Sequence, residues 1–339
     1  MALETNQSLN IFCHKIGQDP FLVQGAGGNV SIKDDNILLV KASGTSLSEA
    51  LKKNIFVSVD LGAMYKEFNK GNFSFTPVCI DSSNLKPSIE TMLHAIMKHK
   101  VVVHLHMVSA LTHLVKYEAE EDLCKIFGND YNWSYVPYTK PGENLARSIS
   151  DILNKKPSTD IIFLGNHGIV IGSDSIVNAE KLLYELDKKL GRKSFDNKKI
   201  RLKANSLQDL RIEGFEWCQD HKLHSLVTNT DLFSFTKKYW ALFPDHVVFL
   251  GDKPFIVDDL NQLFDIDDEE LSNHCFIFIN KVGILQNINA TNAQKEQLTC
   301  YFDVITNISP NLKLKTLSNK EVCELLNWDA EVYRQQLSK

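Results

Sequence analysis

An α/β or α+β protein with two domains is the fold class that this sequence predicts. Segments with helical and strand-like apolar patterns alternate over roughly the first 210 residues. A length of 339 residues with 43% hydrophobic residues is enough for two cores. A polar, charged stretch lies at 191–199. We therefore expect one domain over residues 1–210 and a second, smaller α/β domain over residues 211–339.

The elements of the first domain follow from the spacing of its apolar residues. A glycine-rich turn at 25–28 precedes two short strand patterns. Pro87 suits a first helical turn, and apolar residues at helical spacing continue that helix to His99. The expected elements are helices at 3–16, 87–99, 110–116, 141–153 and 175–190, and strands at 30–32, 37–40, 101–106 and on both sides of residues 166–168.

The second domain has strands and helices of its own but no catalytic constellation. We interpret His246, which follows Pro244-Asp245, as a structural residue. The expected elements are strands at 246–250, 275–280 and 282–285, and helices at 293–305, 321–326 and 331–337.

The composition argues against several classes of protein. The formal charge is −5, from 37 basic and 42 acidic residues, so we expect no nucleic-acid partner. The longest apolar runs are far shorter than the ~20 residues that a membrane helix needs, so we expect no membrane partner. The N-terminus has no basic and apolar leader, and the seven cysteines are scattered, which is typical of reduced thiols. We therefore predict a cytoplasmic protein.

Three histidines indicate a metal site. His104 and His106 follow a run of three valines, and residues two apart in a strand point to the same face. His167 follows the apolar strand at 161–164 and is flanked by Asn166 and Gly168. Imidazole is the commonest metal ligand, and three histidines on a stiff sheet form the ligand set of an open catalytic metal site.

Other polar residues have two interpretations each. Glu90, four residues before His94, is either a solvated glutamate or a carboxylate near the metal that moves protons. The loops at 25–29 and 41–46 are small and polar, which suits phosphate binding, but glycine and serine are also common in ordinary turns. Ser88 is either an anion ligand or a helix cap.

These residues, taken together, resemble the class II aldolase/adducin family of zinc-dependent sugar-phosphate aldolases. The resemblance covers about residues 9–190. Within the family, the chain most resembles the aldolase part of bifunctional rhamnulose-1-phosphate aldolase/alcohol dehydrogenases, without their dehydrogenase domain. Those proteins also carry a segment like residues 243–248. The motifs are Gly28-Asn29-Val30-Ser31, Ser43-Gly44-Thr45, Pro87-Ser88-Ile89-Glu90 and His104-x-His106 with Asn166-His167-Gly168.

The resemblance implies an α/β/α sandwich around a mainly antiparallel sheet, in an oligomer for which a homotetramer is favoured. It implies zinc, or another divalent metal, held by His104, His106 and His167, with Glu90 as the acid/base. Ile89 stands where the fuculose-phosphate branch has a second phosphate-binding serine, which is a departure from that pattern. The residues that the resemblance assigns to the substrate phosphate are Gly28, Asn29, Ser43, Gly44 and Ser88.

The resemblance further implies a small-molecule sugar phosphate as the partner. The expected reaction is cleavage of a ketose 1-phosphate, of the rhamnulose or fuculose type, to dihydroxyacetone phosphate and an aldehyde through a metal-stabilised enediolate. A pentose-phosphate 4-epimerase and a thioribulose-phosphate dehydratase would use the same site and stay open as alternatives. A non-catalytic, adducin-like scaffold is the third alternative, although adducin domains lack the metal histidines that this chain keeps.

Overall fold

A computed structural model describes residues 2–193, 212–309 and 311–337. The chain forms two compact units, one with Met1–Arg192 and Asn327–Lys339 and the other with Lys193–Leu326. The domain boundary predicted at 210/211 lies outside the described residues. Residues 327–337, which the sequence predicts as part of the second domain, pack with the first unit. Within the described ranges, no helix has the length and apolar character that a bilayer crossing requires.

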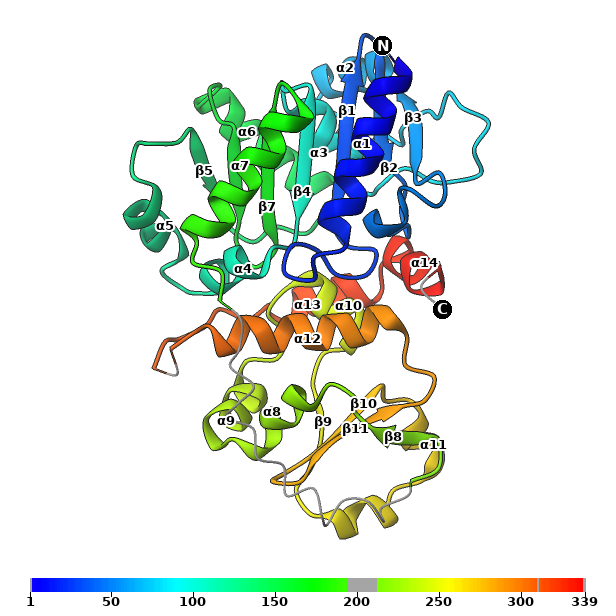
Figure 1. Ribbon diagram of the computed structural model, residues 1–339, viewed down its shortest axis with the longest axis vertical. Helices are drawn as coiled ribbons and strands as arrows, with labels where there is room; N and C mark the ends of the chain where they lie inside the picture. Colours follow the sequence, from blue (N-terminus) through cyan, green and yellow to red (C-terminus); the bar gives the residue numbers. More distant parts are fainter. Residues whose placement is uncertain (1, 194–211, 310, 338–339) are drawn as a thin grey trace. The chain divides into compact units, whose positions relative to one another are not determined.

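The first unit is an α/β/α sandwich, as predicted (Figure 1). Helices α1 and α7 cover one face of a large sheet, and α2, α3 and α6 cover the other. Its elements are α1 (Ala2–Gly17), β1 (Asn29–Asp34), β2 (Ile37–Lys41), η1 (Leu47–Glu49), β3 (Phe56–Asp60), α2 (Leu61–Asn69), α3 (Thr91–Ile96), β4 (Val101–Leu105), α4 (Val108–Leu114), α5 (Ala119–Phe127), β5 (Trp133–Val136), α6 (Glu143–Lys155), β6 (Ile161–Leu164), β7 (Gly168–Ser173), α7 (Ile176–Lys189) and α14 (Asp329–Leu337).

The sheet of the first unit has seven strands in the order β3-β2-β1-β4-β7-β6-β5. Every neighbouring pair is antiparallel except β5 and β6, which are parallel, so the prediction of a mainly antiparallel sheet is confirmed. Strand β4 lies in the middle of the sheet. Its residue His104 is opposite Asn29 of β1 on one edge and Val170 of β7 on the other. The strand that carries the first histidines is therefore paired on both edges.

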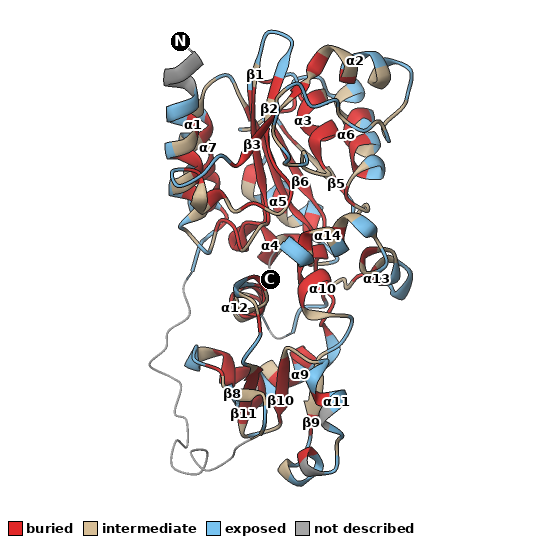
Figure 2. Cartoon of the chain, turned by 90° about the vertical axis from the view of Figure 1, so that its right-hand side faces the viewer, coloured by how far each residue is buried: buried red, intermediate tan, exposed pale blue. Residues whose placement is uncertain are grey.

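The two faces of β4 have different neighbours. Val101, Val103 and Leu105 pack in the core that contains α1 and α7. Val102 packs against α3 and α6 on the other face. His104 shares the Val102 face because strand side chains alternate, so its imidazole is directed toward the side where α3 lies. Figure 2 shows the central strands coloured as buried.

The helix expected at 87–99 is shorter in the structure and begins at Thr91. Pro87 forms an isolated bridge with Ala42, and the residue before the helix is Glu90. At the other end, Met97 turns to an extended conformation (ψ 128°). Tertiary pairing with the loop after β2 therefore overrides the helical pattern at Pro87, and Glu90 lies at the start of α3 instead of on its surface.

The second unit contains a smaller, four-stranded sheet in the order β8-β11-β10-β9. Its core is formed by residues of all these strands together with short helices. Its elements are β8 (Phe215–Trp217), η4 (His221–His224), α8 (Ser225–Thr228), α9 (Thr230–Lys238), α10 (Pro244–Leu250), β9 (Phe255–Val257), η5 (Leu260–Phe264), α11 (Asp268–Ser272), β10 (Phe276–Ile279), β11 (Gly283–Asn287), α12 (Asn292–Thr306) and α13 (Asn319–Leu326).

The strand expected at 246–250 is wrong, because this segment is part of helix α10. Pro244 occupies the first turn of α10, where a fixed φ and a missing N–H cost nothing. The run His246 to Phe249 is buried on all sides, and a short apolar run of this kind does not distinguish a buried helix from a buried strand.

Helix α10 generates a prediction about pH and stability. His246 is fully buried against the rings of Trp240 and Tyr301, and neither of its ring nitrogens has a hydrogen-bond partner among the described residues. Burial lowers the pKa of His246 to about 3, whereas the unfolded chain takes up this proton near pH 6.5. The unfolded state therefore binds more protons between these values, and stability falls as the pH falls through this window.

We expect His246→Phe to reduce the pH dependence of the free energy of unfolding by the contribution of one proton. At its steepest, this contribution is about 1.4 kcal/mol per pH unit. Urea unfolding of the wild-type chain and the variant between pH 7 and pH 4 measures the difference. Parallel stability curves for the two proteins would contradict the assignment of His246 as a buried neutral imidazole.

Candidate active site

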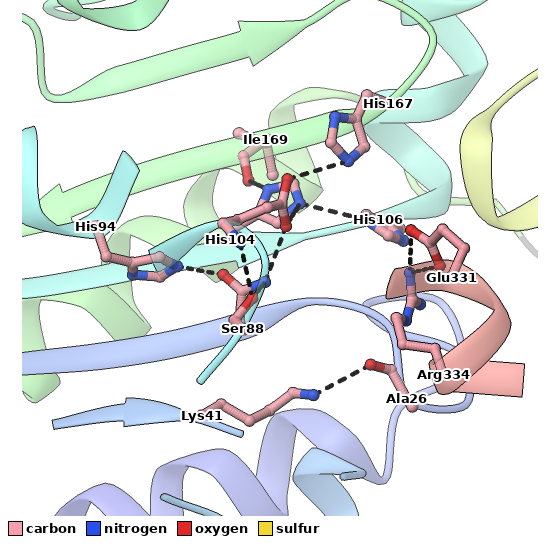
Figure 3. A network of polar contacts seen from close by, with 12 residues as sticks. Ala26, Lys41, Ser88, His94, His104, His106, His167, Ile169, Glu331 and Arg334 are labelled. Carbon is pink, nitrogen blue, oxygen red and sulfur yellow. Dashed lines mark hydrogen bonds and ion pairs between the residues drawn. The ribbon is translucent and has the colours of Figure 1, made fainter. Parts of the chain in front are cut away.

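Three imidazoles form a cluster in the first unit, which we call the histidine cluster. His104 lies at the end of β4, His106 follows it, and His167 lies in the turn between β6 and β7. All three are buried, and one ring nitrogen from each lies within 4.8 Å of the others. The structure thus brings together the three histidines that the sequence analysis selected (Figure 3).

The turn that carries His167 is held by its backbone. Asn166 has a positive φ of 51°, which asparagine tolerates better than most residues. Its N–H donates to the carbonyl of Leu114 at 3.0 Å, and the N–H of His167 donates to the carbonyl of Leu164 at 3.1 Å. The next residue, Gly168, begins β7 at a point where a Cβ would lie 2.4 Å from the carbonyl oxygen of Leu105. Glycine therefore permits the close approach of β7 to β4 beside the cluster.

The hydrogen bonds of His104 define its tautomer. Its Nδ1 lies 3.1 Å from the carbonyl oxygen of Ile169, which can only accept, so Nδ1 carries the proton. In the neutral form that would bind a metal ion, Nε2 presents its lone pair, and it lies 3.2 Å from Nε2 of His106. A metal ion accepts lone pairs from ring nitrogens arranged in this way, and a carbonyl partner at the opposite nitrogen is typical of ligating histidines.

Glu90 adds a carboxylate to the histidine cluster. Its Oε2 lies 3.4 Å from Nε2 of His104, and its Oε1 lies 3.5 Å from Nε2 of His167. The carboxylate is buried, and Oε1 has no hydrogen-bond partner among the described residues. Burial by itself would raise the pKa of Glu90, but the imidazoles and the Asn29 amide lower it to about 2. Three imidazole nitrogens and a buried carboxylate oxygen fit a divalent metal ion.

A buried chain of hydrogen bonds supports this carboxylate from behind. Nδ2 of Asn29 donates to Oε2 of Glu90 at 2.9 Å, and Oδ1 of Asn29 pairs with Nε2 of His94. Nδ1 of His94 lies 2.7 Å from Oγ of Ser31. Burial, reinforced by His104, lowers the pKa of His94 to about 3, so His94 is neutral and donates from Nε2. The chain orients the Asn29 amide toward Glu90.

The place of His94 and Ser31 in this hydrogen-bond chain was not predicted from the sequence. The spacing of four residues predicts that His94 and Glu90 share one helical face, but in the structure their contact runs through Asn29. The available signal was the serine of the Gly28-Asn29-Val30-Ser31 motif, which lies two residues after Asn29 and therefore on the same face of β1.

The residues selected for anion binding lie next to Glu90. Ser88 Oγ accepts from the Asn29 amide at 3.2 Å and from the Glu90 N–H at 3.2 Å. The Ser43 N–H donates to the carbonyl of Lys86 at 2.8 Å, which joins the loop after β2 to the segment before Ser88. We call residues 25–29, 41–46 and 86–88 the candidate anion loops. Gly28 has a φ of +62°, and a Cβ there would lie 2.9 Å from the carbonyl oxygen of His104. The backbone therefore requires glycine at this position, whether or not it binds an anion.

A buried lysine connects two of the candidate anion loops. Nζ of Lys41 donates to the carbonyl of Ala26 at 3.1 Å (Figure 3). It also donates to the carbonyl of Thr45 at 2.5 Å. The side chain is nearly inaccessible to solvent. The sequence analysis included Lys41 only as part of a polar loop, although a lysine at the end of an apolar strand was a signal that could have been used.

The fold and the site together define a class of protein, an α/β/α sandwich with a histidine cluster beside small-residue loops. Residues 11–190 match the sequence pattern of the Class II Aldolase and Adducin N-terminal domain. This match covers more than half of the chain, and the chain therefore belongs to the class II aldolase/adducin family.

Individual proteins of known sequence or structure are similar to this chain. The L-fuculose phosphate aldolase of Methanococcus maripaludis is 32% identical over 167 residues, which cover 45% of this chain and 76% of that protein. A Bacillus subtilis protein named uncharacterized oxidoreductase YuxG is 28% identical over 171 residues, but these cover 46% of this chain and only 24% of that protein. A solved class II aldolase domain from Thermoplasma acidophilum is 24% identical, covers 54% of this chain and 90% of that one, and has a TM-score of 0.45.

The close approach at Gly168 generates a prediction. We expect Gly168→Ala to lower the free energy of unfolding by about 1–3 kcal/mol, because the added Cβ meets the Leu105 backbone, which cannot move aside without disturbing the β4–β7 pairing. Ser173→Ala, on the same strand, adds no atom and serves as the control, with an expected change within about 0.5 kcal/mol. Urea unfolding followed by circular dichroism measures both. Equal stability of the two variants would contradict the argument.

Proposed function

We propose that this chain is a metal-dependent aldolase that cleaves a ketose 1-phosphate to dihydroxyacetone phosphate and an aldehyde. The observation that carries the proposal is the buried cluster of three imidazoles with the Glu90 carboxylate within 3.5 Å of two of them. The fuculose phosphate aldolase relative supports the choice of a ketose 1-phosphate of the fuculose or rhamnulose type.

In this proposal, His104, His106 and His167 would hold zinc or another divalent metal ion. When bound, the ion would supply Lewis-acid stabilisation of the negative charge that develops on the substrate oxygens. The protein contributes a fixed arrangement of donors, because the Ile169 carbonyl fixes the tautomer of His104 and the β4–β7 pairing fixes the ring positions. All three histidines are buried, so their rings are held by the surrounding protein.

Glu90 would be the group that moves the proton. In the direction of synthesis, its carboxylate removes a proton from the carbon of dihydroxyacetone phosphate that forms the new bond. In the direction of cleavage, the same group returns that proton to the carbon after the C3–C4 bond has broken. The Asn29 amide, which donates to Oε2, stabilises the carboxylate form that the synthetic direction requires, and Oε1 is the oxygen without a hydrogen bond among the described residues.

The candidate anion loops would hold the substrate phosphate. Backbone N–H groups and hydroxyls of small residues suit this role, and the residues proposed for it are Gly28, Asn29, Ser43, Gly44 and Ser88. Support comes from the contacts that bring Ser88 to Asn29 and the Ser43 segment to Lys86. The ammonium group of Lys41 lies behind two of these loops and favours an anion there.

A homotetramer and a cytoplasmic location also remain part of the proposal. Light scattering of the purified chain and fractionation of its native cell test them. The 4-epimerase and the dehydratase would use the same residues, and the reaction products distinguish them from the aldolase.

The first test of the reaction uses rhamnulose, fuculose and ribulose phosphates with and without a metal chelator. We expect one ketose 1-phosphate to release dihydroxyacetone phosphate, and we expect the chelator to abolish the release and added zinc to restore it. The assay couples dihydroxyacetone phosphate to its NADH-dependent reduction and follows epimers by chromatography. Epimer formation without cleavage would replace the aldolase by the epimerase, and a protein without affinity for divalent metals would support the scaffold.

The second test separates the metal ligands from the proton carrier. We expect His104→Ala and His167→Ala to lose most bound zinc while the circular dichroism spectrum is retained. We expect Glu90→Gln to keep zinc and to lose roughly 10²–10⁴-fold in turnover, because it lacks the group that exchanges the proton.

Glu143→Gln is the matched control, because Glu143 is half exposed and pairs with Arg147 on the surface of α6. It should keep both zinc and activity. Wild-type turnover in Glu90→Gln, or unchanged zinc content in both histidine variants, would remove these residues from their proposed roles.

A further inference from the structure

The C-terminal helix α14 packs against the candidate anion loops. A Cβ on Gly44 would lie 2.3 Å from Cδ1 of Leu337, so the side chain of Leu337 lies directly on this glycine. Nζ of Lys86 lies 4.2 Å from the centre of the Tyr333 ring, which is a cation–π contact. These two contacts attach α14 to both the loop after β2 and the segment before Ser88.

One face of α14 carries an acid, a base and an apolar residue. Glu331, Arg334 and Leu337 are spaced three apart and therefore share a face of the helix. Because Leu337 contacts Gly44, this face is the one directed toward the loops. Figure 3 shows Arg334 paired with Glu331 on this helix.

Glu331 and Arg334 form a buried ion pair. Nη1 of Arg334 lies 3.0 Å from Oε1 and 2.8 Å from Oε2 of Glu331. Glu331 is 2% exposed and Arg334 is 8% exposed. Charged side chains are seldom buried to this degree unless they are paired. The pair keeps an arginine desolvated next to a proposed anion site.

Both lysines of the candidate anion loops have other contacts, because Lys41 donates to backbone carbonyls and the ammonium group of Lys86 lies over the Tyr333 ring. The five residues proposed for the phosphate carry no charge. Guanidinium groups bind carboxylate and phosphate through the same paired N–H···O geometry. Nη1 of Arg334 faces both oxygens of the Glu331 carboxylate, and a phosphate group could accept from the same nitrogen in its place.

We propose that Arg334 is a ligand of the substrate phosphate and that Glu331 is its internal competitor. The carboxylate neutralises Arg334 when no substrate is bound, and a phosphate monoester dianion replaces it. The inference rests on the proposed function in one respect, which is that the candidate anion loops bind a sugar phosphate. It assigns to the C-terminal segment a part in substrate binding that the predicted aldolase domain, residues 1–210, does not contain.

The test measures binding of glycerol phosphate to the full chain by calorimetry. The buffer contains EDTA, so that an anion bound to a metal ion does not contribute, and glycerol is the uncharged control ligand. We expect Arg334→Gln to raise the Kd about 10- to 100-fold, the range for losing a hydrogen-bonded charge. We expect Glu331→Gln to lower the Kd several-fold, because Arg334 then loses its competitor. Arg334→Lys should fall between the wild type and Arg334→Gln.

Opposite signs are the signature of competition. If the ion pair only held α14 in place, both variants would break the same pair and both would weaken binding. Arg147→Gln breaks a surface pair with Glu143 on α6 and should leave the Kd unchanged. Circular dichroism tests whether each variant is folded. If Arg334→Gln does not fold, the Kd of Arg334→Lys is compared with that of the wild type instead.

Two results overturn the inference. Wild-type affinity in both Arg334 variants, or weaker binding in both Arg334→Gln and Glu331→Gln, rejects Arg334 as a phosphate ligand and leaves the proposed aldolase intact. A wild-type chain that does not bind glycerol phosphate at all rejects the phosphate-binding loops as well, and with them the proposed ketose 1-phosphate substrate.

Discussion

The pairing of β4 with β7 is the constraint on which the rest of the first unit depends. His104 is opposite Val170 and Leu105 is opposite Ile169, so the two strands stay paired up to the residues that precede His106 and follow His167. Gly168 permits this approach, because any side chain there would meet the backbone of Leu105. A slip of one residue would turn the side chains of the strand to the other face of the sheet. It would take His104 away from the Glu90 carboxylate.

Burial of charge explains the composition of the site. A carboxylate without water is costly unless other groups stabilise it, and Glu90 has imidazoles on one side and the Asn29 amide on the other. Asn29 is itself held by a neutral His94, which in turn contacts Ser31. The hydrogen-bond chain is therefore complete on the protein side, and the carboxylate oxygen Oε1 faces the histidine cluster. This is the arrangement that a metal-dependent proton transfer would require, and it is the physical basis of the proposed aldolase reaction.

In the proposed site, the loops beside the histidine cluster would bind the phosphate through backbone N–H and hydroxyl groups. The positive charge would come from Lys41 and Arg334. Lys41 lies at the end of β2 and joins two loops through their carbonyl oxygens. Arg334 lies far along the sequence but packs with the first unit through α14. In the proposed role, the Glu331 carboxylate keeps Arg334 neutralised until an anion with the same geometry replaces it. A site of this kind would discriminate between phosphorylated and free sugars by charge, independently of the metal.

Features that depend on neighbours along the chain could be predicted from the amino-acid order. His104 and His106 are two residues apart, and this spacing predicted that they share a face. The apolar run before Asn166 predicted the strand that precedes His167. The resemblance of the motifs predicted the α/β/α sandwich. The limits of α3 and the helical state of α10 were not predicted, because the Ala42–Pro87 bridge and complete burial override local patterns. Three contacts emerge only from the folded chain: Asn29 links His94 to Glu90, Lys41 joins two loops, and α14 contacts Gly44. These contacts join residues far apart in the chain, and periodicity carries no information about such distances.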